Sequence, residues 1–176
     1  ITLSFWIKSS VAQNFYGNVQ TKEGTTYNYP FETGALSADT WTKITKTIPG
    51  NSNLQIDNDN GAGFQINIYP LLGTDYTASS VTLNQWATFS GSLQTPDNTT
   101  TWWTTNDATL EITGVQLEVG SVATEFEHKS FGEDLQLCSR YYQKQLSGST
   151  KAVASDFAYN TTYGNFSPHY PMGPMR

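Results

Sequence analysis

The segment ITLSFWIK, residues 1–8, alternates apolar and polar side chains along its length. Leu3, Phe5 and Ile7 fall on one face of an extended chain, because successive side chains of a β-strand point to opposite sides. Trp6 is the large apolar residue on the other face. The pattern predicts a strand with one face in a hydrophobic core and Trp6 directed outward.

Similar runs recur along the chain and are separated by polar turns such as TKEG, PGNS and DNDNGAG. Charged and aromatic residues each make up 14% of the sequence, a composition that favours strands and turns over surface helices. The sequence therefore predicts a mainly β fold, a jelly-roll-like antiparallel β-sandwich followed by one α-helix and a short β segment. The further strand-like runs are QNFYGNVQT (13–21), TTYNYPF (25–31), TWTKITKTI (40–48), GFQINIYP (63–70), WATFSGSL (86–93) and ATLEITGVQLEVG (108–120).

The last of these runs changes its alternation part-way. Leu110 and Ile112 are at even positions, whereas Val115, Leu117 and Val119 are at odd positions. A β-bulge at residues 113–114 would keep both sets directed into one core, because a bulge inserts one extra residue into a strand. We predict such a bulge.

A helix is predicted over residues 131–146, where the spacing of the apolar residues changes from two to three or four residues. Ser130 and Glu133 have the spacing of a capping box, in which each side chain bonds the backbone of the other residue. The helix is expected to present one apolar stripe for oligomer or domain packing, and adjacent apolar residues of the helix widen this stripe. The stripe consists of Phe131, Leu135, Cys138, Tyr142 and Leu146.

These elements predict three parts: a sandwich over 1–130, a linking and packing helix over 131–146, and the start of a further β-rich segment over 147–176. The chain opens directly in strand-like sequence without an initiator Met. We therefore expect it to be a piece of a longer protein.

The charge of the chain disfavours nucleic acid and anionic lipid as partners. The formal net charge is -6, and only 9 residues are Lys or Arg. Binding to phosphates requires clustered basic side chains, and here they are scattered. No apolar run approaches the roughly 20 residues that span a bilayer. We expect neither nucleic-acid binding nor membrane insertion.

No catalytic residues are predicted. The single Cys138 is expected to be a small core residue on the apolar side of the helix. A nucleophilic role would need His128 or His169 in a recognisable arrangement, and the sequence offers none. Glu125 and Glu127 are close enough to invite an acid/base pair, but beside a helix cap they are better explained as solvated charges or partners of the helix dipole.

No metal site or cofactor is predicted either. DNDNG, residues 57–61, alternates oxygen-bearing side chains, but its Gly is fifth and its twelfth residue is Ile68, so the spacing of a calcium loop fails. A tight turn before the next strand is the better interpretation.

Three aromatic residues are the candidates for carbohydrate binding: Trp102, Trp103 and Tyr76. The two tryptophans are adjacent in the polar, loop-like stretch NTTTWWTTND, so at least one is expected to face away from the core. Exposed aromatic rings can stack on the apolar faces of sugars. The alternative is that one Trp lies in the core and the other covers a sheet edge.

Four segments of the chain carry a resemblance to a known family: SFWIKSS (4–10), TWTKITKTIPG (40–50), NDNGAGFQINI (58–68) and ITGVQLEVGSVATEFEHKSFGEDLQLCSRYYQK (112–144). They resemble a β-sandwich module found in tail-fibre and other virion structural proteins of tailed bacteriophages, including marine ones. The resemblance covers roughly residues 1–144, and its last motif is the most specific. The family usually has Pro at the position of Glu125 and further strands before the position of Ile1.

The resemblance implies a non-enzymatic module of an elongated, often trimeric appendage of the virion, with no catalytic residues to transfer to this chain. We expect a homotrimer that contacts other virion proteins and a host-surface glycan. Three alternatives remain open: the carbohydrate-binding module of a secreted glycanase, a capsid or tail decoration without a ligand, and a domain that cleaves polysaccharide itself.

Overall fold

A computed structural model describes residues 1–59 and 61–139. The chain divides after Phe126 into two compact units. The first unit contains the strands, and the described part of the second contains the helix α2 (Phe131–Ser139). The remainder of the predicted helix and the predicted β-rich segment over 147–176 lie outside the described residues.

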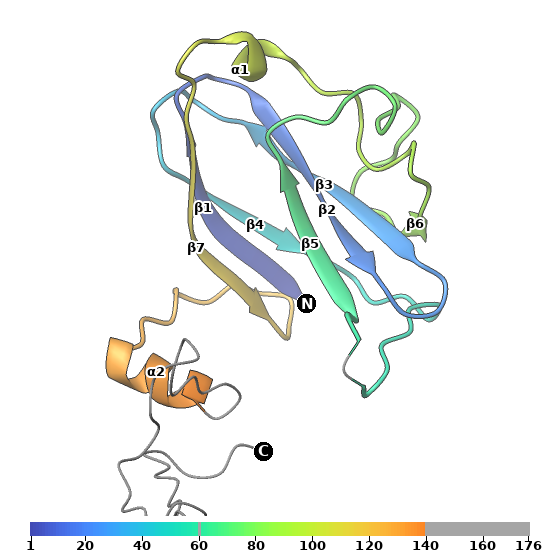
Figure 1. Ribbon diagram of the computed structural model, residues 1–176, viewed down its shortest axis with the longest axis vertical. Helices are drawn as coiled ribbons and strands as arrows, with labels where there is room; N and C mark the ends of the chain where they lie inside the picture. The colour runs from blue at the N-terminus through green and yellow to red at the C-terminus, as the bar shows by residue number, and fades with distance from the viewer. Residues whose placement is uncertain (60, 140–176) are drawn as a thin grey trace, which may run out of the picture. The chain divides into compact units, whose positions relative to one another are not determined.

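The first unit is a β-sandwich of two antiparallel sheets, which confirms the predicted mainly β fold (Figure 1). One sheet has the strand order β4-β1-β7 and the other the order β5-β2-β3-β6. We call them sheet A and sheet B. The strands are β1 (Thr2–Ser9), β2 (Asn14–Thr21), β3 (Tyr27–Ala35), β4 (Thr42–Thr47), β5 (Phe64–Tyr69), β6 (Ala87–Thr88) and β7 (Leu110–Glu118).

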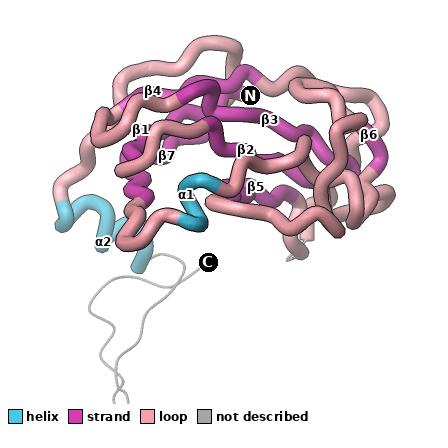
Figure 2. The backbone as a smooth tube through the Cα atoms, turned by 90° about the horizontal axis from the view of Figure 1, so that it is seen from above, coloured by secondary structure: helices cyan, strands magenta, loops and turns pink. Residues whose placement is uncertain are grey.

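The core lies between the facing sheets, which Figure 2 shows from above. Leu3, Phe5 and Ile7 of β1 are fully buried, and Trp6 lies on the outer face, as the alternation predicted. Phe15 and Phe31 fill the same core from sheet B. Burial of alternate side chains is what fixes the register of each strand, since a slip of one residue would expose all of them.

Strand β7 contains the predicted bulge, but it does not bury both sets of apolar residues. Trp6 pairs with Thr113 and Ser4 with Gln116, so two residues of β7 oppose one of β1. Ile112 and Leu117 lie on the core side, opposite buried residues of β1, yet they are 40% and 45% exposed. The register confirms that Ile112 and Leu117 are directed to the core side, and they stay partly exposed because β7 is an edge strand, beyond which no other described strand pairs.

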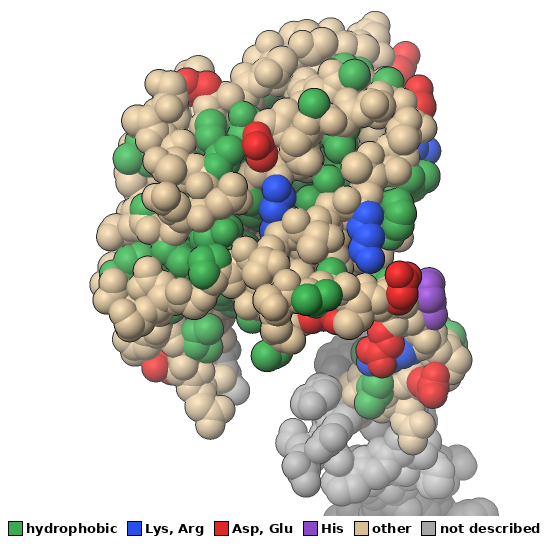
Figure 3. All heavy atoms as spheres, turned by 180° about the vertical axis from the view of Figure 1, so that it is seen from behind, with side chains coloured by type: hydrophobic (Ala, Val, Ile, Leu, Met, Phe, Trp, Pro, Cys, Tyr) green, Lys and Arg blue, Asp and Glu red, His purple; other side chains and the backbone are tan. Residues whose placement is uncertain are grey.

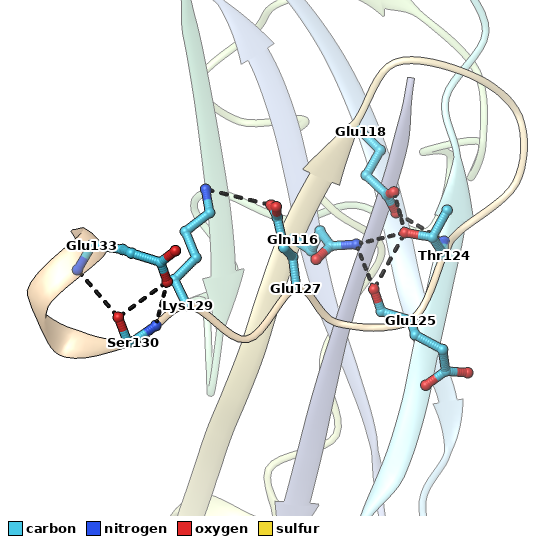
Figure 4. Close-up of polar contacts among 8 residues, drawn as sticks. All are labelled: Gln116, Glu118, Thr124, Glu125, Glu127, Lys129, Ser130 and Glu133. Carbon is cyan, nitrogen blue, oxygen red and sulfur yellow. Dashed lines mark hydrogen bonds and ion pairs between the residues drawn. The ribbon is translucent and has the colours of Figure 1, made fainter. Parts of the chain in front are cut away.

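Residues 119–126 form a strap that crosses the outer face of sheet A. The Thr2 hydroxyl of β1 donates a hydrogen bond of 2.9 Å to the Gly120 carbonyl. The Glu118 carboxylate accepts bonds from the Thr124 backbone N–H at 3.0 Å and from its hydroxyl at 2.6 Å (Figure 4). Thr2 is fully buried as a result, although it points away from the core.

In the second unit, α2 begins with the predicted capping box (Figure 4). The Glu133 carboxylate accepts hydrogen bonds from the Ser130 backbone N–H at 3.1 Å and from its hydroxyl at 3.0 Å. In return, the Glu133 backbone N–H donates to the Ser130 hydroxyl oxygen at 3.3 Å. This reciprocal pair satisfies N–H groups that have no partner within a helix.

Candidate functional site

The two adjacent tryptophans have different environments. Trp102 belongs to the short helix α1 (Thr101–Thr104), at a place where the sequence predicted a loop. Its ring packs edge-on against Phe15, with 6.1 Å between centroids, and its Nε1–H donates to the Thr109 carbonyl at 3.1 Å. Its backbone N–H donates to the Gln13 side chain at 2.9 Å. Trp102 therefore anchors α1 to the sandwich.

Trp103 and Tyr76 are the exposed members of the aromatic set, at 66% and 50% exposure. The structure gives neither residue a ring contact with the other candidates. The sequence correctly predicted that one tryptophan faces away from the core. It did not identify a group of aromatic rings that act together.

A different surface, the outer face of sheet B, brings polar side chains together. The registers place Tyr16 opposite Tyr69, and Asn18 opposite Asn67, all on the side away from the core. Asn28 of β3 lies on the same face. The long segment 70–98, which includes β6 at the edge of the same sheet (Figure 1), contributes Gln94 to this face. We define the amide–tyrosine cluster as Asn18, Asn28, Asn67, Tyr69 and Gln94.

The cluster is joined by hydrogen bonds that cross the sheet. The Asn67 Nδ2 donates to the Asn18 Oδ1 at 2.8 Å, and the Tyr69 hydroxyl lies 3.3 Å from the same oxygen. The Tyr69 hydroxyl also lies 3.2 Å from the Gln94 Oε1. The Asn28 Nδ2 donates to the Gln94 backbone carbonyl at 3.0 Å. Gln94 thus links the side chains of β5 and β3 across β2.

Two atoms of the cluster have no hydrogen-bond partner among the described residues: the Asn18 Nδ2 and the Asn28 Oδ1. Asn18 is 0% exposed and Asn28 is 2% exposed. Leaving a buried donor or acceptor unsatisfied costs about 1–3 kcal/mol. Such groups are rare in folded proteins and call for a water or a ligand atom to satisfy them.

The orphan atom of Asn28 is fixed by its bond to a backbone carbonyl, and that of Asn18 follows from the orientation of the Gln65 amide. The Gln65 Nε2 donates to the Asn67 Oδ1 at 2.7 Å, which leaves the Asn67 Nδ2 to donate to the Asn18 Oδ1. The Nδ2 of Asn18 is therefore the atom without a partner. For Asn28, the bond to the Gln94 carbonyl requires Nδ2, so its Oδ1 is the free acceptor.

The electrostatics of this face keep its tyrosines neutral. Burial raises the pKa of the Tyr69 hydroxyl, and its hydrogen bond with Asn18 opposes that shift. Burial is also the main cause that raises the pKa of Tyr16, followed by the negative charge of Glu32 and, more weakly, of Asp97. Both hydroxyls therefore remain protonated and able to donate near neutral pH.

The apolar stripe of α2 is present but exposed. Phe131 is 83% exposed, and Leu135 is 48% exposed. Cys138 is also exposed, so the expectation that it is a core residue was wrong. Periodicity shows which residues share a helix face, and it does not show whether that face is covered. Tyr142 and Leu146, the last two residues of the predicted stripe, lie outside the described residues.

The described residues contain no group of three or more His, Cys, Asp or Glu side chains placed to hold a metal ion. Glu127, half of the acid pair that the sequence invites, lies 3.4 Å from the Lys129 ammonium. On the face shown in Figure 3, basic and acidic side chains are interspersed, and the lysines do not form a patch. No helix among the described residues is long and apolar enough to span a membrane.

Comparisons with protein-family models, curated proteins and solved structures give no match.

Sequence reasoning missed the amide–tyrosine cluster, although a signal was available. Tyr16, Asn18 and Gln20 alternate with the core residues of β2, and Gln65, Asn67 and Tyr69 do the same in β5. The outer faces of these strands carry amides and phenols in place of Lys and Glu. That composition could have been read from the two segments, but their pairing in one sheet could not.

Proposed function

We propose that the protein is a non-enzymatic structural component of a virion, part of a phage tail fibre or similar appendage, with an adhesive role toward host-surface glycans. The amide–tyrosine cluster is the observation that carries the adhesive role. Amide groups donate and accept hydrogen bonds as sugar hydroxyls do, and tyrosine adds an apolar ring and a hydroxyl. The motif resemblance over residues 1–144 supports the virion assignment.

A binding protein and a polysaccharide-cleaving enzyme predict different results with the same polysaccharides. The proposal predicts that retention or fluorescence changes depend on the sugar, whereas the amount of reducing ends stays constant over hours. Reducing ends that increase with time and with protein concentration would contradict it. The assay works before the ligand is identified, because each polysaccharide serves as its own control without protein.

The exposed stripe of α2 supports an assembly role. A large apolar residue such as Phe131 at 83% exposure marks a surface suited to another polypeptide. We propose that the occupant is the same helix of other copies, in a homotrimer around a threefold axis. The capping box fixes where this helix begins and so which side chains share the stripe.

Light scattering tests this assembly. The proposal predicts a mass near three times 19.5 kDa for the chain and a shift toward the monomer in Leu135→Lys. The matched control is Gln136→Lys, which places the same charge on the adjacent residue of the helix, outside the stripe. A trimer that Leu135→Lys leaves unchanged would contradict the role of α2.

Two other functions make different predictions. A carbohydrate-binding module of a secreted glycanase would bind sugar as a monomer. A capsid or tail decoration without a ligand would bind no sugar and would attach to a purified virion partner. The amide–tyrosine cluster fits the first alternative as well as it fits the fibre, so the oligomeric mass is the observation that separates the two.

A further inference from the structure

The two orphan atoms of the amide–tyrosine cluster are complementary. Asn18 offers a donor and Asn28 offers an acceptor. Asn18 pairs with Pro30, and Gln20 pairs with Asn28, so the two asparagines are diagonal neighbours on the outer face of sheet B. Diagonal neighbours are about 7–8 Å apart at the backbone, a span that one small group between the side chains can bridge.

A hydroxyl group matches this pair. Its oxygen accepts a hydrogen bond from the Asn18 Nδ2, and its hydrogen is donated to the Asn28 Oδ1. A carboxylate or sulfate has no hydrogen to donate and would leave the Asn28 Oδ1 unsatisfied. An ammonium group has no lone pair to accept with and would leave the Asn18 Nδ2 unsatisfied.

Charges of both signs lie at this face. Glu32 and Asp97 act on the Tyr16 hydroxyl. The Lys22 ammonium donates a hydrogen bond of 2.6 Å to the Oε1 of Gln20, which pairs with Asn28. The Glu32 carboxylate also accepts a bond of 2.7 Å from the Asn14 Nδ2, which fixes its position. An anionic sugar that lies beside Tyr16 would be repelled by the two carboxylates there, since like charges at short range are unfavourable. Tyr16 and Tyr69, opposite each other in the register, supply neutral rings and hydroxyls.

We propose that Asn18 and Asn28 form the inner end of a saccharide subsite that takes one hydroxyl group of an uncharged sugar. This inference rests on the proposed adhesive function and specifies its ligand class. Both orphan atoms are enclosed, and the Gln94 segment is the part of the cluster that connects the strands from outside the sheet. Entry of the sugar therefore displaces Gln94, and its hydroxyl completes the bonds of the two asparagines.

Affinity electrophoresis tests this subsite with soluble polysaccharides in the gel. The neutral panel is dextran, mannan, galactan and laminarin, and the acidic panel is alginate and polygalacturonate. The expected result is retardation by at least one neutral polymer and by neither acidic polymer. Asn18→Asp replaces the orphan donor by an acceptor but keeps the oxygen that Asn67 and Tyr69 contact. It should weaken binding about tenfold or more.

The controls separate loss of the subsite from loss of the fold. Asn53→Asp makes the same change on an exposed turn and should bind like the unmodified protein. Asn18→Ala removes the donor without burying a carboxylate and should also lose binding. Each variant is first compared with the unmodified protein by thermal unfolding, so that only folded variants enter the gel.

The outcomes distinguish this inference from the function on which it rests. Retardation by acidic polymers alone, or retardation that both Asn18 variants retain, would overturn the subsite and leave the adhesive function standing. No retardation by any polymer would contradict the adhesive function and the subsite together, and would make a trapped water the partner of the two orphan atoms.

Discussion

Replacing each of the two adjacent tryptophans by alanine should give very different losses of stability. In Trp102→Ala, the hydrogen bond from Nε1 to the Thr109 carbonyl is lost, which costs about 1 kcal/mol. The edge-on contact with Phe15 contributes about 0.5–1.5 kcal/mol more. The partly buried ring also loses its apolar burial, which brings the total loss in the free energy of unfolding to about 3 kcal/mol. This value is near the lower end of the cost of Trp→Ala substitutions in cores.

Trp103→Ala removes a ring that is 66% exposed and should change the free energy of unfolding by less than about 0.5 kcal/mol. Urea denaturation followed by far-ultraviolet circular dichroism measures both variants. With a slope of about 2 kcal/mol per molar urea, Trp102→Ala should lower the midpoint by about 1.5 M. If the two variants lose stability to within about 0.5 kcal/mol of each other, or if Trp103→Ala loses more, Trp102 is not the anchor of α1.

Three further perturbations test separate parts of the structure. In Gly17→Ala, the new Cβ would lie 2.5 Å from a backbone oxygen of β5 and 2.5 Å from an aromatic ring of β3. We expect a loss of about 3 kcal/mol or abolished folding, whereas Gly50→Ala, which meets nothing within 4 Å, should be neutral in the same thermal melts. The pKa of Glu118 is lowered, mainly by the hydrogen bond from the Thr124 side chain. The hydrogen bonds between Glu118 and Thr124 that hold the strap are therefore complete above the ordinary Glu pKa. They are lost as the pH falls through the lowered pKa of Glu118. The Thr124 amide resonance should titrate below the pH expected of a free glutamate, and a titration that persists in Glu118→Gln would exclude this carboxylate as its cause. Ser130→Ala deletes the cap of α2 and should lower the stability of this helix by about 1 kcal/mol. Unchanged amide hydrogen exchange across the first turn of the helix would contradict that expectation.

The strands could be predicted because their signal is local. In β1, alternation alone identified Leu3, Phe5 and Ile7 as core and Trp6 as outward, and the structure confirms each. The bulge in β7 was predicted in the same way, from a change of parity at a glycine. Pleating and bulges are properties of single strands, so one segment contains the information.

Burial could not be predicted where it depends on the position of an element in the fold. Ile112 has the pattern of a core residue, but its strand lies at the edge of sheet A. Cys138 lies on an apolar stripe whose described members are exposed. In both cases the sequence identified the apolar face, and the fold determined whether another element covers it.

The candidate site could be predicted least, because it is a product of strand pairing. Asn18 and Asn28 are close in sequence, but Asn67, Tyr69 and Gln94 join them through the register of β5 and the path of residues 70–98. Exposed aromatic rings can be recognised from their polar neighbours in the sequence. Two buried amide atoms without partners leave no such local signal.

Nuclear magnetic resonance of the asparagine side-chain amides observes the proposed saccharide subsite itself. The protein is labelled with ¹⁵N at asparagine and at tryptophan, and neutral oligosaccharides from the polymer that retards it are added. We expect the Asn18 side-chain amide signal, together with that of Asn28, to shift as the sugar saturates the protein. Unchanged Asn18 and Asn28 signals, with a shift of the Trp103 indole signal instead, would place the binding site at α1 and rule out the subsite at the two asparagines.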